Sequence, residues 1–527
     1  MAVPTMKAYI GGKALEELSE GVHLQYVEVR QELYQHWWSE VACRQSEDQR
    51  FKIEEWLGQE MEVIAADENG QAHRVFDGFV LDVELEYEIW GSYTARVKGV
   101  SHSYKMDLTP RHYYYNTESL SDIASKCADR AKLSSKCSTE PKSRPDFYIQ
   151  WGETDFQFLC RLADDHQAWL RPTLDGIEIM NLFLDGPKLQ WRDEYGLLNF
   201  KVRGQLGQPS MNGSHYQRSK MESKTYEEVK EEPNFYDSSG PLVGKVKSES
   251  KKVLPPGYVH DRNAAVEQYD YEKLLKKESA RAIGSKVTAH GVSRNPGVKP
   301  GNDVYVAGAL DAQGGYGVTR AIHRWNEKGY LNEFWATVWR EYTQPERPVS
   351  RRAPGVASGR VVDNADPLKQ GRVAVKFYWQ EDMDTHFFRI LTPHAGADRG
   401  FYFIPEVGDE VLVAFEEGDL GRPMVLGSLW NGVDKPPVQD FWGGEHADND
   451  CKRIVTKSGH RIQIVDKPGK ESIVIATPKV LKITLIEKTD ETGRSAISVC
   501  SEDGDILLSA PNGRIHFRSK FFSREVG

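Results

Sequence analysis

The chain has 527 residues, enough for three or more domains of ordinary size. Its 78 Asp and Glu outnumber its 68 Lys and Arg, and the resulting net charge of −10 argues against a general nucleic-acid-binding protein, because phosphate binding needs a basic face. No run approaches the roughly 18 apolar residues of a membrane span. The N-terminus has no signal-peptide pattern and the six cysteines form no CxxC pair, so we expect no leader and reduced thiols in a protein folded in the cytosol.

The first 350 residues mix predicted strands with predicted helices. Residues 76–100 predict two strands on either side of a turn at Trp90-Gly91, and residues 119–133 predict a capped helix. A longer helix is expected over residues 264–283, with Gly284 just past its end. The stretch from 204 to 255 is polar and rich in charge, and we expect its Lys and Glu runs to be solvated surface.

Residues 148–173, "YIQWGETDFQFLCRLADDHQAWLRPT", predict a strand followed by a well-capped helix. Thr154 and Gln157 fit a capping box, and Asp155 lies where the helix dipole favours a negative charge. Glu153 and Asp155 could also be viewed as a pair of catalytic carboxylates. No partner acid or base has a recognisable context, so we expect them to have capping and turn roles.

Residues 355–432 predict a small β-barrel. Val373, Val375 and Phe377 alternate along one strand, residues 411–415 form a near-continuous apolar run, and turn residues separate the segments. Five short strands in about 75 residues suit an OB-type barrel. The expected strands are 359–362, 372–378, 387–391, 411–415 and 423–429.

Six strand-like segments follow one another near the end of the chain, from Arg461 to Ser519. Each carries two apolar residues at i and i+2, the pattern of a strand with one buried face. The last two segments are expected to form a hairpin around the turn Pro511-Asn512-Gly513. The apolar pairs are Ile462/Ile464, Ile473/Ile475, Ile483/Leu485, Ile497/Val499, Ile506/Leu508 and Ile515/Phe517.

Two arrangements would bury these stripes. One is a barrel or sandwich within a single chain, and the other is an intertwined β-helix in which several chains pool their narrow apolar faces. Two inward residues per strand are a thin supply for a free-standing core, which favours the intertwined arrangement.

Several stretches closely resemble one family. "DPLKQGRVAVKFYW", "PHAGADRGFYFIPEVGDEVLVAFEEGD" and "RPMVLGSLWNG" are similar to the OB-barrel block of the VgrG family, the spike proteins of type VI secretion systems. That family is related to the central spike of contractile phage tails. Residues 153–162 also resemble the ETD-x-x-FL-x-RL segment of the family's hub domain.

The resemblance implies a mainly β chain with an α+β hub of phage-hub-like barrel lobes, an OB-fold barrel and a C-terminal intertwined trimeric β-helix, here called the needle. The expected divisions are hub 1–350, barrel 355–432, linker 433–460, and needle with tip 461–527. In a homotrimer the other two copies would cover the first five apolar pairs, which therefore form the expected needle core. A tip cap is expected to bind Ile515, Phe517, Phe521 and Phe522.

The implied function is the spike of a type VI secretion-like contractile injection machine, which sits on a hexameric inner tube, punctures a target membrane and carries a cap and effectors. The implied partners are two further copies, an Hcp-like tube protein, a PAAR-repeat tip protein, baseplate components, and effectors or their adaptors, with no nucleic acid. The protein would be assembled in the bacterial cytoplasm and exported on the tube. The alternatives are a spike of an extracellular phage-tail-like particle or of a phage baseplate.

An enzyme, such as a cell-wall hydrolase with the barrel as its binding module, is the alternative of a different class. The sequence has no HExxH, GxSxG, P-loop or EF-hand pattern, so we expect no catalytic residue and no cofactor. "GGEHADND", residues 443–450, gathers acids and His446, but without a recognised ligand spacing, so we expect a hydrated linker and no metal there.

Overall fold

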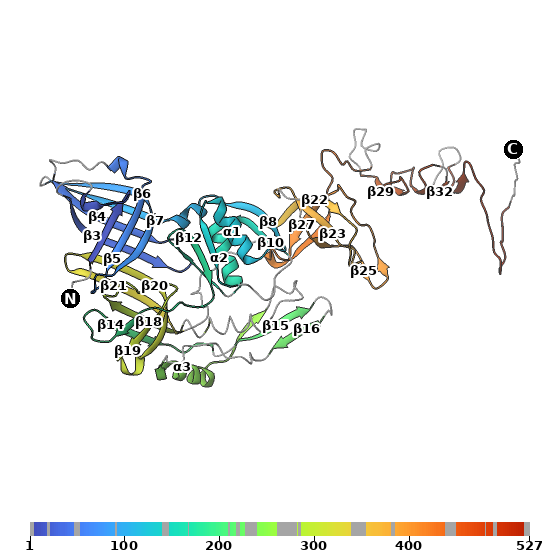
Figure 1. The fold of residues 1–527 in the computed structure, drawn as a ribbon. Helices are drawn as coiled ribbons and strands as arrows, with labels where there is room; N and C mark the ends of the chain where they lie inside the picture. The colour runs from blue at the N-terminus through green and yellow to red at the C-terminus, as the bar shows by residue number, and fades with distance from the viewer. Residues whose placement is uncertain are drawn as a thin grey trace. The chain divides into compact units, whose positions relative to one another are not determined.

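The computed structural model shows a mainly β protein, as predicted (Figure 1). It forms two compact units, Met1–Ser428 and Leu429–Gly527, each described by itself below. Within the described residues no helix is long and apolar enough to cross a membrane. The structure describes residues 5–520 except 18–21, 47–52, 90–91, 140–146, 167, 209–210, 218–221, 227–239, 261–281, 283–285, 339–354, 381–384, 438–448, 480 and 488–492.

A 13-stranded sheet forms the framework of the first unit. Its main path runs β14-β18-β21-β20-β3-β4-β7-β6-β5-β1-β2, with β19 paired to β20 and β13 paired to β19. The first seven strands in chain order alternate apolar and polar residues, and their apolar sides enclose a core around Val27, Met61 and Phe76. These strands are β1 (Thr5–Ile10), β2 (Lys13–Ala14), β3 (His23–Glu32), β4 (Trp38–Ser46), β5 (Glu60–Ala66), β6 (Ala72–Glu88) and β7 (Ser92–Ser101).

The other half of the sheet encloses a second core, around Val306, Tyr316 and Phe334. The two halves are joined where β3 pairs with β20, which places Glu32 opposite Arg320 although 288 residues separate them along the chain. The strands of this half are β13 (Lys188–Gln190), β14 (Leu197–Gly204), β18 (Val287–Ser293), β19 (Asp303–Ala307), β20 (Gly314–Asn326) and β21 (Gly329–Thr337).

Two helices and two small sheets build a third core in this unit. Both predicted helix starts are confirmed: Ser119 caps α1 (Leu120–Arg130), and Thr154 caps α2 (Asp155–Asp165), each within a complete capping box. Their buried faces, led by Phe158 and Leu159, pack with Trp169. The strands are β8 (Arg111–Asn116), β9 (Ser134–Cys137), β10 (Phe147–Glu153), β11 (Trp169–Pro172) and β12 (Gly176–Met180).

The polar stretch 204–255 combines exposed charged residues, such as Lys251 and Lys252, with a buried side chain. It contains α3 (Gly240–Val253), whose Val246 is only 6% exposed and belongs to the second core. Three strands form a separate sheet: β15 (Met211–Gln217) and β16 (Glu222–Tyr226) within this stretch, and β17 (Gly257–His260) just after it. The predicted turn at Trp90-Gly91 and most of the predicted helix 264–283 lie outside the described residues.

The predicted five-stranded barrel is present and closed, with strand order β22-β23-β24-β28-β27. Val375, Val411 and Val413 point into it and are completely buried. A small hairpin of β25 and β26 precedes three consecutive exposed aromatic residues, 401–403. The elements are β22 (Val356–Asp363), β23 (Val373–Phe377), β24 (Phe387–Ile390), β25 (Ala395–Gly396), β26 (Arg399–Gly400), β27 (Glu410–Phe415) and β28 (Pro423–Ser428).

The barrel shares its core with the β8–β10 sheet. Tyr114 and Ile149 of that sheet are buried in the same cluster as Phe377 of the barrel. The ring centroids of Trp151 and Trp379 lie 5.1 Å apart in an edge-to-face contact, a favourable arrangement for aromatic pairs. The barrel and the preceding domain are therefore held by side-chain packing as well as by chain connection.

The second unit is built on one antiparallel sheet in which each strand pairs with the next along the chain. Its order is β29-β30-β31-β32-β33, with Gly459 and Gly469 at positive φ in two of the turns. The strands are β29 (Cys451–Val455), β30 (Arg461–Val465), β31 (Ser472–Ala476), β32 (Leu481–Ile486) and β33 (Ala496–Ser501).

Short 3-10 helices of the first unit are η1 (Leu15–Glu17), η2 (Ile53–Glu55), η3 (His102–Met106), η4 (Leu310–Ala312) and η5 (Glu416–Gly418).

Candidate functional site

The strand register of the second unit places most of the branched aliphatic residues of its strands on one face. Residues paired directly across antiparallel strands share a face, and neighbours two apart along a strand share it too. Two adjacent columns result, which together we call the apolar ladder. The first column is Ile454, Ile462, Ile475, Ile483 and Val499, and the second is Ile464, Ile473, Leu485 and Ile497.

Among the described residues of the second unit, none covers this ladder fully. The exposure of its members runs from 39% at Ile464 to 76% at Ile497, although aliphatic residues of this size are usually buried. The opposite face of the same sheet shows the reverse pattern, since Val474 and Thr484 are buried there. The sheet therefore exposes its more apolar face, and an exposed apolar patch of this extent marks an interaction surface.

The structure brings together eight of the predicted core residues and leaves the other predictions untested or changed. The first four predicted strands form, and all four of their apolar pairs lie in the ladder. The last two predicted strands do not form: residues 502–520 contain no strand, and Ile506, Leu508, Ile515 and Phe517 are exposed. This corrects the expected hairpin, since an isolated strand pair is at best marginally stable without partners. Phe521 and Phe522 lie outside the described residues.

Sequence reasoning missed the first strand of the sheet. β29 lies inside the stretch expected to be a linker, and its Ile454 starts the ladder's first column opposite Ile462. The strand has a weak signal because Lys452 occupies the place in the second column that an aliphatic residue would fill, opposite Ile464. The Lys452 ammonium lies 3.9 Å from the Asp466 carboxylate.

The carboxylates weighed as catalytic residues are held in ion pairs. Both oxygens of Asp155 accept hydrogen bonds from Arg130, at 2.6 and 2.9 Å, and both oxygens of Glu153 accept from Arg161, each at 2.7 Å. Such forked pairs fix the orientation of both side chains, a structural role that the predicted capping and turn roles did not include. His446 lies outside the described residues.

The cysteines are all free thiols, in line with the prediction. Burial raises the pKa of the Cys43 and Cys127 thiols to about 12, which keeps both protonated at neutral pH. A protonated, buried thiol is a poor nucleophile, so neither residue suits covalent catalysis.

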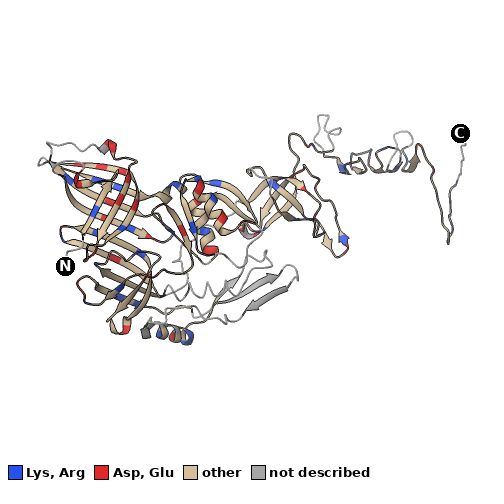
Figure 2. Cartoon of the chain, viewed as in Figure 1, with Lys and Arg blue, Asp and Glu red and all other residues tan. Residues whose placement is uncertain are grey.

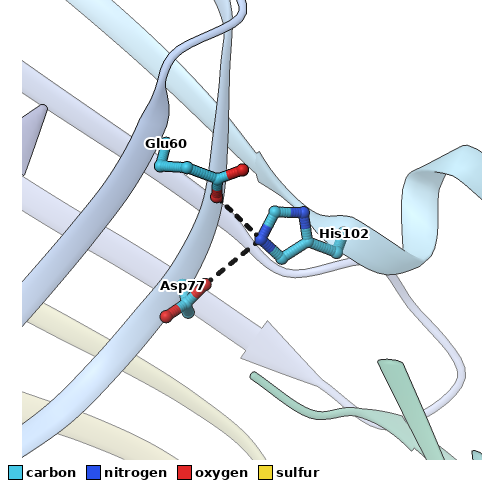
Figure 3. A group of neighbouring side chains, drawn as sticks. All are labelled: Glu60, Asp77 and His102. Carbon is cyan, nitrogen blue, oxygen red and sulfur yellow. Dashed lines mark ion pairs between the residues drawn. The ribbon is translucent and has the colours of Figure 1, made fainter. Parts of the chain in front are cut away.

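One group of metal-ligating side chains was not predicted. Figure 3 shows Glu60 and Asp77 converging on His102, whose Nε2 lies 3.0 Å from one carboxylate and 3.2 Å from the other. The second ring nitrogen, Nδ1, lies 3.3 Å from the Lys105 ammonium, which can only donate a hydrogen bond. Nε2 must then carry the proton and donate it to the carboxylates, so its lone pair is not free for a metal. The group fits a hydrogen-bonded ion cluster better than a metal centre.

Comparison with known proteins matches two parts of the chain to family models. Residues 357–430 match the family model of the type VI secretion system/phage-baseplate injector OB domain, and residues 32–169 match that of the phage tail baseplate hub. The type VI secretion system spike protein VgrG4b of Pseudomonas aeruginosa is 29% identical to this chain over 162 residues. The chain is similar to VgrG spike proteins. The match covers 28% of this chain and 20% of VgrG4b, so it spans only part of that relative.

Solved structures share the VgrG-type fold over most of the chain. The E. coli c3393 protein, described as a type VI secretion component similar to the T4 tail proteins gp27 and gp5, aligns with a TM-score of 0.52 and 16% identity, over 80% of this chain and 100% of its own. A chain of the half-lidded Francisella PdpA–VgrG complex aligns with a TM-score of 0.58 and 10% identity, over 95% of this chain and 88% of its own. At these identities the likeness concerns the fold.

Proposed function

We propose that this chain is the homotrimeric spike of a type VI secretion-like injection machine, and that the apolar ladder is the core of a needle wound from three chains. The observation that carries the proposal is the two-column ladder that a single chain leaves uncovered. Similarity to spike proteins supports it, because VgrG4b, which matches 28% of this chain, is named as a spike protein.

The energetics favour association of the ladders. Fully burying an aliphatic side chain contributes about 1.5–3 kcal/mol. The ladder residues are 39–76% exposed in one chain, so covering the rest is worth on the order of 1 kcal/mol for each. Nine such residues give on the order of 10 kcal/mol per chain before the entropy of association is subtracted. That gain is comparable to the stability of a whole domain.

Copies of the same chain are the fitting cover for this surface. The ladder is only two columns wide. Two such narrow faces packed against each other would make too small a core for a sandwich of two sheets. Three identical narrow faces turned toward a common axis bury one another completely and leave no member of the closed ring uncovered. In this arrangement residues 461–527 form needle and tip, 355–432 the barrel and 1–350 the hub.

The remaining partners follow from the same proposal. The hub would sit on a hexameric Hcp-like tube and contact baseplate components, and effectors or their adaptors would bind the assembled spike. A PdpA–VgrG complex is known from Francisella, which supports binding of a further protein by spikes of this fold. The exposed Ile515 and Phe517 suit a PAAR-type cap. Assembly would take place in the bacterial cytoplasm, and the spike would leave the cell on the tube.

We propose no enzymatic activity for this chain, and a role in an extracellular phage-tail-like particle or phage baseplate is the second candidate. Light scattering on the purified full chain tests the main proposal: a mass of three chains is expected, and a folded monomer with an ordered second unit would contradict it. Pull-down from the native host with and without residues 519–527 tests the cap. Recovery of the cap by both forms would place its binding site elsewhere.

A further inference from the structure

Positive charge is concentrated on the first four strands of the second unit and their turns. Residues 451–482 contain eight Lys and Arg but only two acidic residues, a surplus of six positive charges in a chain whose net charge is −10. Figure 2 shows blue Lys and Arg positions along this part of the sheet. The cations are Lys452, Arg453, Lys457, Arg461, Lys467, Lys470, Lys479 and Lys482, and the acids are Asp466 and Glu471.

The strand register places these cations where solvent would meet a closed needle. Arg461 and Lys482 share a column on the face opposite the ladder. Four lysines lie in the turns between strands, namely Lys457, Lys467, Lys470 and Lys479. All six of these residues are exposed. Only Lys452 lies on the ladder's face. Covering the ladder therefore leaves the positive charge on the outside, and three copies would carry it around the whole circumference.

The charge reverses further along the chain. Residues 487–505 contain six acidic residues and two basic ones, Lys488 and Arg494. The basic part is thus a band of limited length: four strands spaced about 4.8 Å apart extend for about 14 Å. A bilayer headgroup region is roughly 5–8 Å deep on each side of the hydrocarbon, so the band is long enough to contact one throughout its depth.

We propose that this basic band binds the anionic headgroups of a lipid bilayer. The inference rests on the proposed function, because it requires the ladder to be covered and the needle to reach a membrane. Six of the eight cations are lysines, whose ammonium is a compact point charge without the forked geometry that arginine uses to read a fixed anion. Scattered, mobile point charges suit a fluid surface of phosphates, where each adjacent cation adds to the attraction.

Other polyanions fit this band less well. A nucleic acid tracks a continuous basic groove, whereas the acidic stretch 487–505 interrupts the basic surface after four strands. A protein ligand would be read by a defined set of forked or buried contacts. In the band, by contrast, the turn lysines lie at both ends of the strands, with the length of a strand between the two groups.

Vesicle flotation with the full chain tests the proposal. Vesicles of phosphatidylcholine mixed with phosphatidylglycerol are expected to carry the protein, and vesicles of phosphatidylcholine alone are not. Raising the salt from about 0.1 M to about 1 M shortens the Debye length from about 10 Å to about 3 Å and should release it. Replacing four turn lysines should weaken the partitioning at least about tenfold. The variant carries Lys457→Gln, Lys467→Gln, Lys470→Gln and Lys479→Gln.

A matched variant removes the same number of exposed lysines from the hub and should bind as the native protein does. It carries Lys7→Gln, Lys13→Gln, Lys201→Gln and Lys328→Gln. Three outcomes would each overturn the proposal: the needle variant binds vesicles as well as the native protein does, the hub variant loses as much binding as the needle variant, or the native protein shows no preference for anionic vesicles. So would retention on a single-stranded polynucleotide without vesicle binding. Light scattering on the same samples measures the oligomeric state separately. A trimer that does not bind anionic vesicles would contradict only the lipid proposal, whereas a monomer would contradict the proposed spike.

Discussion

Replacing Ile483 with lysine distinguishes a needle core from a surface strand. Ile483 lies in the middle of the ladder, paired with Ile475 on one side and Val499 on the other, and it is 42% exposed in one chain. In a single chain a lysine could extend from this position into water, and surface substitutions usually change stability by less than about 0.5 kcal/mol.

The expected effect is far larger if three ladders meet. Ile483→Lys would then place three ammonium groups near a common axis without counter-ions. Each buried charge costs several kcal/mol after relaxation, so the trimer would lose on the order of 10 kcal/mol or more. Because the entropy of association already cancels much of the gain from burying the ladders, a loss of this size removes a large part of the net stability of the trimer. We expect the needle to open while the hub and barrel stay folded.

Light scattering and hydrogen exchange of the amides in residues 461–501 measure this outcome. The matched control is Ser498→Lys, which introduces the same side chain on the opposite face of the neighbouring strand, where Ser498 is exposed and paired with Thr484. The control should remain trimeric with protected needle amides. If Ile483→Lys behaved like the control, the ladder could not be the buried core.

Three further predictions concern single residues. Thr154→Ala removes the side-chain acceptor for the Gln157 amide and should lower the stability of the first unit by about 0.5–2 kcal/mol, measured by urea unfolding. Burial lowers the pKa of His323 to about 3, below its unfolded value of about 6.5, so unfolding takes up a proton between these values. Stability should therefore fall by up to about 1.4 kcal/mol for each pH unit below about 6.5, and His323→Gln should flatten that slope in unfolding curves at several pH values. Lys452→Ile completes the ladder's second column opposite Ile464 and should raise the thermal midpoint of needle dissociation; a lowered midpoint would show that the lysine stabilises the needle.

Local sequence signals predicted the local structure well, and long-range pairing was out of their reach. The capping boxes at Ser119 and Thr154 were readable because each depends on residues three apart. The alternation from Ile462 to Val499 likewise predicted one apolar face. The pairing of Glu32 with Arg320 carries no such signal, since 288 residues separate them and no short pattern encodes which strands become neighbours.

The two errors in the second unit have the same physical origin. A strand is stable when its neighbour and its covering layer are both present, and the sequence of one strand reports neither. β29 was missed because Lys452 hides its alternation, yet β30 pairs with it along its whole length. The segments around Ile506 and Phe517 have the alternating pattern of strands. Among the described residues, however, neither segment pairs with β33 or with the other segment.

The core shared between the barrel and the β8–β10 sheet bears on how such chains can be recombined. A graft that exchanged the barrel at its sequence boundary would cut through a packed cluster, leaving Tyr114 and Ile149 facing a foreign surface. The hydrogen bond between the Tyr114 hydroxyl and His386 Nδ1, 3.1 Å long, would have to be rebuilt as well. A functional chimaera therefore needs the barrel and strands β8 and β10 to come from the same parent. The segment that must be exchanged as a whole is larger than the barrel domain seen in the sequence.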